Sequence, residues 1–345
     1  MGRLEGATFP DWPTINRHTV GVGEWSEIEH KAGGAGKRYP QAMIEAGQRA
    51  LDGFIRVLEG EGVTVVRPDV VSYDRPFSSP DWEVGVGFSC ANPRDPFLVV
   101  GDDIIESPMA DRNRYFEGRA YRRLFRDYLV RGARWSAAPR PTLGDELFDP
   151  TYVRPPVPGA GESLQYVVTE HEPVFDAADA CRCGRDVFVQ LSHVTNRLGV
   201  HWLQQHLGDG FRVHVIESRN PEAIHLDTTF VPLCPGKAIV SPEYIDVKRL
   251  PAALRKWEIL EAPEPVPTVG DPLGIMSRWG AINMLMLDPQ RPVVEARQEP
   301  LIRALRDWGF SPVPVSFEAY YPFMGGFHCS TLDVRRRGTL ESYCD

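Results

Sequence analysis

One order of secondary structure recurs along the chain. Residues 97–100 predict a strand, 101–103 a tight turn and 104–105 a second strand, and a helix is expected over about 112–130. The order strand, turn, strand, helix, strand returns with a period of roughly 45–50 residues, which is typical of propellers and arrays rather than of a simple open sheet. The sequence therefore predicts an α/β fold of repeated modules, with residues 1–345 forming a single domain.

The remaining elements follow the same order. An amphipathic helix is expected over residues 38–61, because apolar residues recur there at three- and four-residue steps, and a strand over 63–66 follows it. The other expected elements are a strand at 186–191, a helix at 194–207, a strand at 212–216, a hairpin from 226–230 to 238–240, strands at 283–287 and 293–294, a helix at 297–308 and a strand at 313–317. No Gly/Ser linker or low-complexity tract divides them.

Composition excludes several classes of partner. The chain has 47 acidic residues against 38 Lys and Arg, a net charge of −9, so neither nucleic acid nor an anionic membrane is expected as the main partner. No apolar run reaches the ~18–20 residues of a membrane span, and the N-terminus has no apolar signal segment. Six scattered cysteines are no disulfide framework, so we expect a cytoplasmic protein with reduced thiols. No phosphate loop or dinucleotide motif suggests a nucleotide cofactor.

The sequence GGFHC at residues 325–329 carries the strongest sign of chemistry. A cysteine can be a nucleophile when a histidine and an acid reach it in space, and His225 and Asp176 are upstream partners of the right type. Taken alone, Cys329 is more readily explained as a buried strand cysteine, because free cysteine is among the most buried residue types. In a strand, His328 would point to the face opposite Cys329 and would not be the base.

Several longer motifs resemble those of one enzyme family. They are NPRD at 92–95, IIESPMA at 104–110, EGRAYR at 117–122, EPVFDAAD at 172–179, HLD at 225–227 and the stretch from 325 to 345. Together they are similar to the arginine-dependent amidinotransferases, the family of glycine amidinotransferase and inosamine-phosphate amidinotransferase. The resemblance implies a pentein fold, a propeller of five ββαβ modules with pseudo-fivefold symmetry around a central active site. It also implies a homodimer that acts on small-molecule substrates and needs neither cofactor nor metal.

The resemblance also assigns roles to individual residues. Cys329 is the nucleophile that attacks the guanidinium carbon of arginine, which releases ornithine and leaves an amidino-cysteine. His225 protonates ornithine and then deprotonates the incoming amine, while Asp176 orients His225. The positions expected to contact substrate are Asp95 and Asp227, which grip the guanidinium, together with Ser277, Arg114, Met109, Ile224 and Tyr244.

The chain departs from the family at three places. The family's first strand has no counterpart before Met1, so either the start is longer or the first module lacks a strand. Tyr244 stands where glycine amidinotransferase has an arginine for the donor carboxylate, which leaves donor anchoring open. Ile224 replaces a methionine that limits the acceptor space there, and because it is shorter and β-branched we expect an acceptor amine larger than glycine.

Hypotheses from different classes remain open. The leading one is a transferase that moves the amidino group of arginine to an amine in specialised-metabolite biosynthesis, such as that of an antibiotic. Glycine or an inosamine phosphate is an alternative acceptor. An arginine deiminase or dihydrolase of the same superfamily would use water in place of the amine. A catalytically inactive scaffold protein is disfavoured, because every position of the triad is filled.

Overall fold

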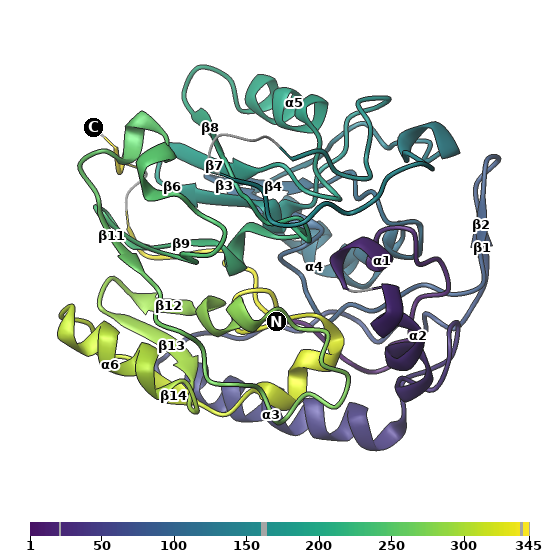
Figure 1. The fold of residues 1–345 in the computed structure, drawn as a ribbon, viewed down its shortest axis with the longest axis horizontal. Coiled ribbons are helices and arrows are strands. Elements are labelled where there is room, and N and C mark those ends of the chain that lie inside the picture. Colours follow the sequence, from purple (N-terminus) through teal and green to yellow (C-terminus); the bar gives the residue numbers. More distant parts are fainter. Residues whose placement is uncertain (21, 160–163, 339–340, 345) are drawn as a thin grey trace.

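Four three-stranded sheets repeat one topology in the computed structural model, which describes residues 1–20, 22–159, 164–338 and 341–344 (Figure 1). In each sheet the first two strands form an antiparallel hairpin, and the third strand pairs parallel with the second after a crossover. Parallel pairing needs such a crossover, because a tight turn can join only antiparallel neighbours. The predicted α/β fold of repeated strand, turn, strand, helix and strand is therefore confirmed.

The four modules differ mainly in their crossovers. The first two contain β3 (Phe97–Val100), β4 (Asp103–Glu106), α4 (Arg122–Val130) and β5 (Arg134–Ala137), then β6 (Ala180–Cys183), β7 (Asp186–Gln190), α5 (Arg197–Leu207) and β8 (Arg212–Ile216). The third contains β9 (Phe230–Cys234), β10 (Lys237–Val240), the 3-10 turns η6 (Val247–Arg249) and η7 (Ala252–Leu254), and β11 (Glu258–Glu261). The fourth contains β12 (Leu285–Asp288), β13 (Arg291–Glu295), α6 (Glu299–Asp307) and β14 (Val313–Val315).

The N-terminal part adds no three-stranded sheet among its described residues. It contains α1 (Asn16–Thr19), α2 (Val22–Lys31), α3 (Gln41–Gly60) and a small hairpin of β1 (Phe77–Ser78) with β2 (Glu83–Val84), which projects from the right edge in Figure 1. The prediction of a strand at residues 63–66 is wrong. These residues are largely exposed, and the Met1 amino group contacts the carbonyl of Val66 at a single point, 3.1 Å away. A β-prone segment without a continuous partner forms no ladder.

Two further expectations needed correction. The helix expected over 112–130 is α-helical only from Arg122, and the 3-10 turns η1 (Arg112–Arg114) and η2 (Glu117–Tyr121) precede it. The reason is burial: Arg114 and Glu117 face the interior rather than a solvated helix face. The strand expected to start at 226 instead begins with the 3-10 turn η5 (Leu226–Thr228), and β9 follows it.

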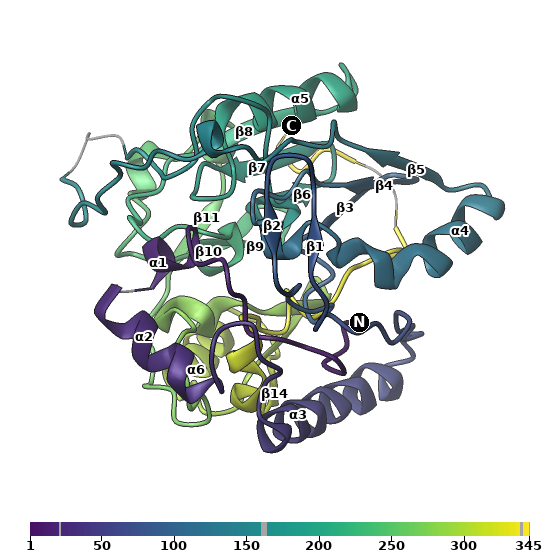
Figure 2. The ribbon, with the colours of Figure 1, turned by 90° about the vertical axis from the view of Figure 1, so that its right-hand side faces the viewer.

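Helix α3 connects the largest apolar cluster to the C-terminal segment. Leu51 and Phe54 on its inner face are fully buried, and the Phe54 ring lies 5.5 Å from Phe317 and 4.9 Å from Phe327, between ring centroids. Figure 2 shows α3 and α5 on opposite sides of the molecule, with the sheets between them. Because Phe327 belongs to the GGFHC sequence at residues 325–329, this packing anchors that segment against α3.

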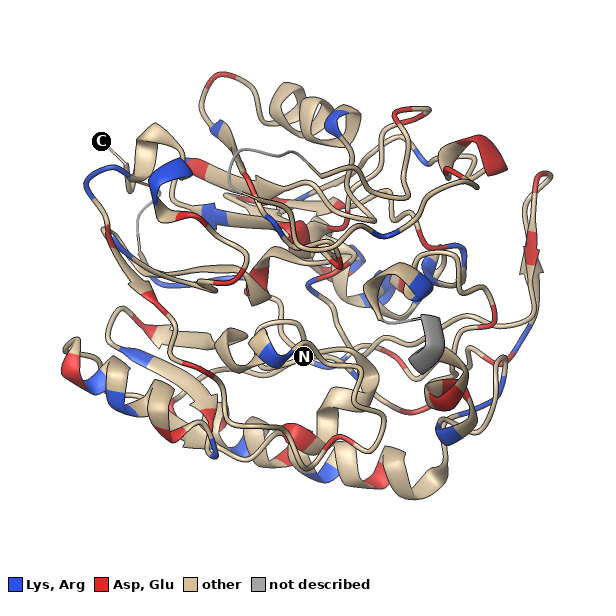
Figure 3. Ribbon diagram, in the orientation of Figure 1, with Lys and Arg blue, Asp and Glu red and all other residues tan. Residues whose placement is uncertain are grey.

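Charges of both signs are distributed over the elements. In the view of Figure 3, basic and acidic residues are both spread over helices, strands and loops. Within the part of the chain that the structure describes, no helix is long and apolar enough to cross a membrane.

Candidate active site

Cys329 lies in a turn rather than in a strand. The N–H of Ser330 donates to the carbonyl of Gly326 at 3.0 Å, and the N–H of Thr331 donates to the carbonyl of His328 at 3.1 Å. Strand alternation therefore does not apply here, and the expectation that His328 points to the opposite face is wrong. Both side chains instead reach the same carboxylate oxygen, Asp227 Oδ2.

Two glycines allow this turn to approach its neighbours. A Cβ atom on Gly325 would lie 2.1 Å from Asn92 Oδ1, and one on Gly326 would lie 2.5 Å from Asn283 Oδ1. Real Cβ atoms do not come that close, so a larger residue at either position would displace the neighbouring amide side chain. The contact with Asn283 has a chemical consequence, because its Nδ2 donates to Cys329 Sγ at 3.1 Å and its Oδ1 accepts from the Cys329 N–H at 3.4 Å.

His225 lies between two buried carboxylates. Its Nε2 is 3.1 Å from Asp176 Oδ2, and its Nδ1 is 3.8 Å from Asp95 Oδ1. One ligand atom each from Asp95, His225 and Cys329 all lie within 4.8 Å of one another. Burial alone would lower the pKa of His225, but Asp95, Asp176 and the bond to Cys329 outweigh it and raise that pKa well above the ordinary value. The imidazole is thus a cation that can donate a proton to a leaving amine.

The fold explains why these residues meet. Asp95 precedes β3, Asp176 precedes β6 through the 3-10 turn η4 (Ala177–Asp179), His225 precedes β9 through η5, and Asn283 precedes β12. Each module therefore contributes one polar side chain from the segment that leads into its first strand. The carbonyl of Asp95 accepts from the Ala177 N–H at 2.7 Å, which ties the first two of these segments together.

The thiol of Cys329 is itself held by a carboxylate. Its Sγ donates to Asp227 Oδ2 at 3.2 Å, and the same oxygen lies 2.8 Å from Nδ1 of His328. Burial, together with the negative charge of Asp227, raises the pKa of Cys329 to about 12, and His225 opposes this shift. Burial also acts to raise the pKa of Asp227, but the bond from His328 outweighs it and the net shift is downward. In the free site the thiol is protonated and Asp227 is charged.

Buried carboxylate oxygens around the thiol lack donors. Oδ1 of Asp95, Oδ1 of Asp176 and Oδ1 of Asp227 have no hydrogen-bond partner among the described residues, although all three are inaccessible to solvent. An unsatisfied buried acceptor costs about 1–3 kcal/mol. A planar guanidinium group carries five N–H donors and a positive charge, so it could satisfy several of these oxygens at once.

Arg114 lies beside Asp95 and Asp176. Its Nη2 is 2.8 Å from Asp95 Oδ2, and its Nη1 is 3.7 Å from Asp176 Oδ2. Its Nε and Nη2 also bind the two carboxylate oxygens of Glu117 at 2.7 and 2.8 Å. The contact of Arg114 with substrate stays a prediction. Sequence reasoning missed Glu117, although its position three residues after Arg114 in an expected helix was a usable sign of pairing.

The remaining predicted residues lie in different environments. Met109 is buried after β4, and Ile224 is half-buried against the apolar cluster that contains Val167 and Val194. Tyr244 is 9% exposed and belongs to another apolar cluster, with Trp279. Ser277 is exposed and caps a 3-10 turn by accepting from the Trp279 N–H at 3.2 Å. These contacts do not test a role in substrate binding, so all four assignments stay predictions.

Sequence reasoning also missed Asn283, which it placed at the start of a strand. The modular repeat could have revealed it, because Asn283 stands before β12 as Asp95 stands before β3. By spacing alone, Asp95, His225 and Cys329 could also ligate a metal ion. Metal binding there would need a neutral imidazole and a thiolate, and the expected absence of a metal stays a prediction.

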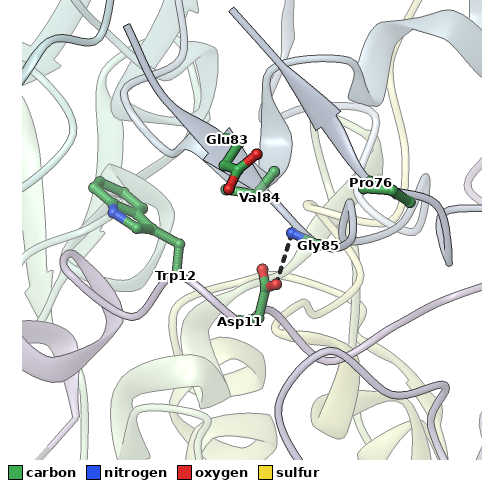
Figure 4. Close-up of a pocket in the computed structure, with 6 residues that line it drawn as sticks. All are labelled: Asp11, Trp12, Pro76, Glu83, Val84 and Gly85. Carbon is green, nitrogen blue, oxygen red and sulfur yellow. Dashed lines mark hydrogen bonds between the residues drawn. The ribbon is translucent and has the colours of Figure 1, made fainter.

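A separate surface pocket of about 320 Å³ lies between the N-terminal segment and the β1–β2 hairpin (Figure 4). It is lined by Asp11, Trp12, Pro76, Glu83, Val84 and Gly85. Asp11 Oδ2 accepts from the Gly85 N–H at 2.7 Å, which closes the pocket on one side. It contains none of the predicted site residues.

The sequence has close relatives of known activity, although no family model matches it. It is 42% identical over 343 residues to the L-arginine:L-lysine amidinotransferase of Pseudomonas savastanoi pv. phaseolicola, covering 99% of this chain and 92% of that one. It is 38% identical over 348 residues to the mitochondrial glycine amidinotransferase of Gallus gallus, covering 100% of this chain and 82% of that one.

Solved structures agree with these relatives. SxtG, an amidinotransferase of the saxitoxin biosynthetic pathway from Microseira wollei, matches with a TM-score of 0.94 and 52% identity over 99% of this chain and 95% of that one. The inosamine-phosphate amidinotransferase StrB1 of Streptomyces griseus matches with a TM-score of 0.83 and 36% identity over 100% and 95%. The N-terminal domain of ArgZ, a cyanobacterial arginine dihydrolase, shares the fold at a TM-score of 0.55 and 15% identity, over 84% and 86%. The chain therefore has the pentein fold and belongs to the amidinotransferases, enzymes that transfer amidino groups.

Proposed function

We propose that this enzyme transfers the amidino group of L-arginine to an amine through a covalent amidino-cysteine at Cys329, releasing ornithine. The observation that carries the proposal is the arrangement around the thiol. Asp95 and Asp227 each present a buried oxygen without a donor, and the His225 imidazole lies beside them. Such a site has a place for a planar cation, a nucleophile and an acid.

The first half-reaction follows from these positions. A guanidinium bound by Asp95 and Asp227 brings a positive charge next to Cys329, which lowers the pKa of the thiol so that its proton passes to solvent. The thiolate then forms a C–S bond to the guanidinium carbon. As the bond from that carbon to the side-chain nitrogen of arginine breaks, the His225 imidazolium gives that nitrogen a proton, and ornithine departs.

The second half-reaction reverses the roles. Neutral His225 takes a proton from the incoming amine, whose nitrogen forms a bond to the amidino carbon as the C–S bond breaks. Cys329 leaves as a thiolate and takes a proton back from solvent once the guanidino product departs, while His225 keeps the proton of the amine. Asn283 Nδ2, which lies 3.1 Å from Sγ, can stabilise the thiolate in both steps.

The proposed acceptor is an amine larger than glycine, used in specialised metabolism. Two observations favour it: the shorter Ile224 at the expected acceptor side, and the 52% identity to SxtG against 38% to the chicken glycine enzyme. A hydrolase is less well supported, because the arginine dihydrolase ArgZ shares only 15% identity.

We also propose a homodimer in the cytoplasm. Cys90, Cys181, Cys183, Cys234 and Cys329 form no disulfide, which suits a reducing compartment, and the dimer is an expectation from the family. Light scattering on a size-exclusion column should give twice the mass of the chain, and a single-chain mass would contradict the dimer.

The covalent intermediate provides the direct test. With arginine alone, the enzyme should gain one amidino group in its intact mass, because the second half-reaction lacks its amine. Cys329→Ala should show no gain, whereas Cys90→Ala, which removes another buried cysteine, should load like the wild type. Ornithine formation that persists in Cys329→Ala would contradict the assignment of the nucleophile.

A further inference from the structure

We propose that Arg114 and Glu117 are a positioning pair for this reaction: Glu117 fixes Arg114, and Arg114 holds Asp95 and Asp176 against His225. This assignment rests on the proposed function, and it replaces a direct contact between Arg114 and the substrate. The pair would act on both half-reactions, because both use His225.

Contacts among four side chains form a closed ring. His225 faces Asp176 through Nε2 and Asp95 through Nδ1. On their other sides, both carboxylates face the guanidinium of Arg114, Asp95 at 2.8 Å and Asp176 at 3.7 Å. A shift of Arg114 would therefore move the carboxylate that orients the imidazole and the carboxylate expected to grip the guanidinium of the donor.

Glu117 determines where Arg114 can lie. The two side chains form a bidentate pair, with N···O distances of 2.7 and 2.8 Å, and they are 1% and 8% exposed, respectively. A bidentate pair fixes both the position and the plane of a guanidinium. Nε, Nη1 and Nη2 of Arg114 each face a carboxylate of this chain, and the guanidinium also lies 5.5 Å from the Phe88 ring centroid. Nε and Nη2 of Arg114 are thus hydrogen-bonded within the chain, and Nη1 lies within ion-pair distance of Asp176.

The pair also sets the electrostatic potential at His225. The groups that act on His225 directly are Asp95, Asp176 and Cys329, and the charges of Asp179 and Asp227 also interact with it. Arg114 is the cation in contact with the first two carboxylates. Glu117 neutralises part of that cation from the far side.

The charge of Glu117 affects the pKa of His225 through Arg114. Burial raises the pKa of Glu117 to about 7, with Arg114 opposing the shift, so Glu117 is charged above that pH. Removing its charge leaves more of the positive potential of Arg114 at His225, which disfavours the imidazolium and lowers the pKa of His225. A side chain that served only to fill space would not cause this shift.

The experiment compares Glu117→Gln and Arg114→Lys with Arg112→Lys. Arg112 is a matched control, because it lies on the same 3-10 turn, is 7% exposed and binds Leu143 and Asp145 instead. We expect Glu117→Gln and Arg114→Lys to lower kcat by roughly 10–100-fold, the cost of a small misplacement. The KM for arginine should change by a smaller factor than kcat, because a displaced Asp95 weakens only one contact with the donor, whereas His225 serves both half-reactions. The limb of the kcat/KM–pH profile that reports His225 should move to lower pH in Glu117→Gln, by roughly half a unit or more. Arg112→Lys should match the wild type.

Three results would overturn the proposal. If Arg114→Lys raises KM for arginine and leaves kcat unchanged, Arg114 contacts the substrate. If the pH limb of Glu117→Gln does not move, the pair is only structural. If Glu117→Gln and Arg114→Lys together cost the sum of the two single effects, the residues do not act as a unit.

Folding and the overall reaction are checked separately. Far-UV circular dichroism and thermal melting identify a variant that does not fold. For such a case, Glu117→Asp keeps the charge but withdraws the carboxylate, so it should lower kcat without moving the limb, and an unchanged kcat would contradict the pair. Loading of Cys329 by arginine in the wild type tests the proposed function. If the wild type loads normally but the Glu117 and Arg114 variants keep the wild-type kcat, only the positioning role is rejected and the proposed function stands.

Discussion

The thiol of Cys329 illustrates how burial and charge determine reactivity at a single residue. It is 2% exposed, donates to Asp227 and lies near Asp95. Burial first, and then these negative charges, raise its pKa to about 12, although His225 opposes the effect. A nucleophile in this state is inert until a cation enters the site, which limits damage by oxidants and electrophiles.

Alkylation measures this state. The free enzyme should react slowly with iodoacetamide at neutral pH, and the rate should rise as pH increases, because the thiolate forms only near the raised pKa. Asp227→Asn removes a negative charge beside Sγ, so the pKa should fall and alkylation at a given pH should become faster. At the same time arginine should no longer load the enzyme, because a guanidinium acceptor is lost. Peptide mapping assigns the adduct to Cys329, and Cys329→Ser is the blank. Slower alkylation in Asp227→Asn would contradict this electrostatic account.

Sequence reasoning identified side chains that lie together better than it identified their surroundings. The structure brings Cys329, His225, Asp176, Asp95 and Asp227 into one cluster of contacts, as the motifs had suggested, and their roles in the reaction stay predictions. Asn283 and Glu117 escaped because an amide and a carboxylate have ordinary roles in strands and helices. Only the packing of modules shows that these two face the site.

At the scale of elements, the turn at 325–329 depends on small residues more than on backbone strain. Neither Gly325 nor Gly326 has a positive φ, whereas Met324 has one of 57°. The glycines matter because neighbouring amides lie where their Cβ atoms would be. The Asn92 amide Nδ2 donates to the carbonyl of Phe323 at 2.8 Å, which joins this turn to the segment before β3.

Substitution of Gly326 tests this close packing. In Gly326→Ala the new methyl must displace Asn283, which holds Cys329 Sγ, so kcat should fall by roughly 100-fold, as for other small misplacements of catalytic groups. Gly60→Ala is the control, because nothing lies within 4 Å of its Cβ and it ends α3 with no positive φ. Single-turnover loading with arginine measures the effect. Equal loading rates in Gly326→Ala and the wild type would show that Asn283 is not needed for attack.

Packing of α3 makes a second, thermodynamic prediction at this scale. Phe54 is fully buried between Phe317 and Phe327, and truncating a buried phenylalanine costs about 3–5 kcal/mol. Phe54→Ala should therefore lower the free energy of unfolding in urea by about that amount. It should also slow loading, because Phe327 is part of the turn that carries Cys329. A loss below about 1 kcal/mol would mean that the cluster repacks.

Buried strands were predicted correctly from the sequence, whereas partly exposed strands were missed. Strands β3, β7, β10 and β13 were found because they are continuous apolar runs with buried patterns. Strands β5 and β11, the third strands of their sheets, were missed. Each has exposed ends and half-buried middle residues, so tertiary pairing with the central strand, rather than local sequence, makes them strands.

At the scale of the whole molecule, the repeated modules bring residues that are far apart in the sequence to one place. Residues separated by more than two hundred positions meet because each module directs its entry segment to the same place: ligand atoms of Asp95 and Cys329 lie within 4.8 Å of each other, with His225 beside them. The period read from the sequence predicted this arrangement in outline. It could not predict which entry segments carry the functional residues.

The segment that leads to His225 also depends on several parts of the chain. His193 Nε2 lies 2.9 Å from the carbonyl oxygen of Pro221, and the backbone N–H of His193 donates to the carbonyl of Ala223 at 3.0 Å. Arg154 forms an ion pair with Glu222 at 2.6 Å. The position of Ile224, the residue proposed to limit the acceptor space, is therefore fixed by residues from the second module and from the segment before it.

Acceptor choice tests this whole-molecule view. Ile224 is shorter than the methionine expected at this position in glycine amidinotransferase, so wild type should have a higher kcat/KM for lysine, γ-aminobutyrate or an aminocyclitol than for glycine. Ile224→Met should shift the preference toward glycine, by the ~1–3 kcal/mol that about one methylene is worth in a pocket. Ile224→Leu conserves volume and serves as the control. Arginine with each amine in turn, with the guanidino products quantified by mass spectrometry, gives the ratios. A clear preference of the wild type for glycine would show that Ile224 does not enlarge the pocket. The segment at residues 221–224 would then have no part in selecting the amine.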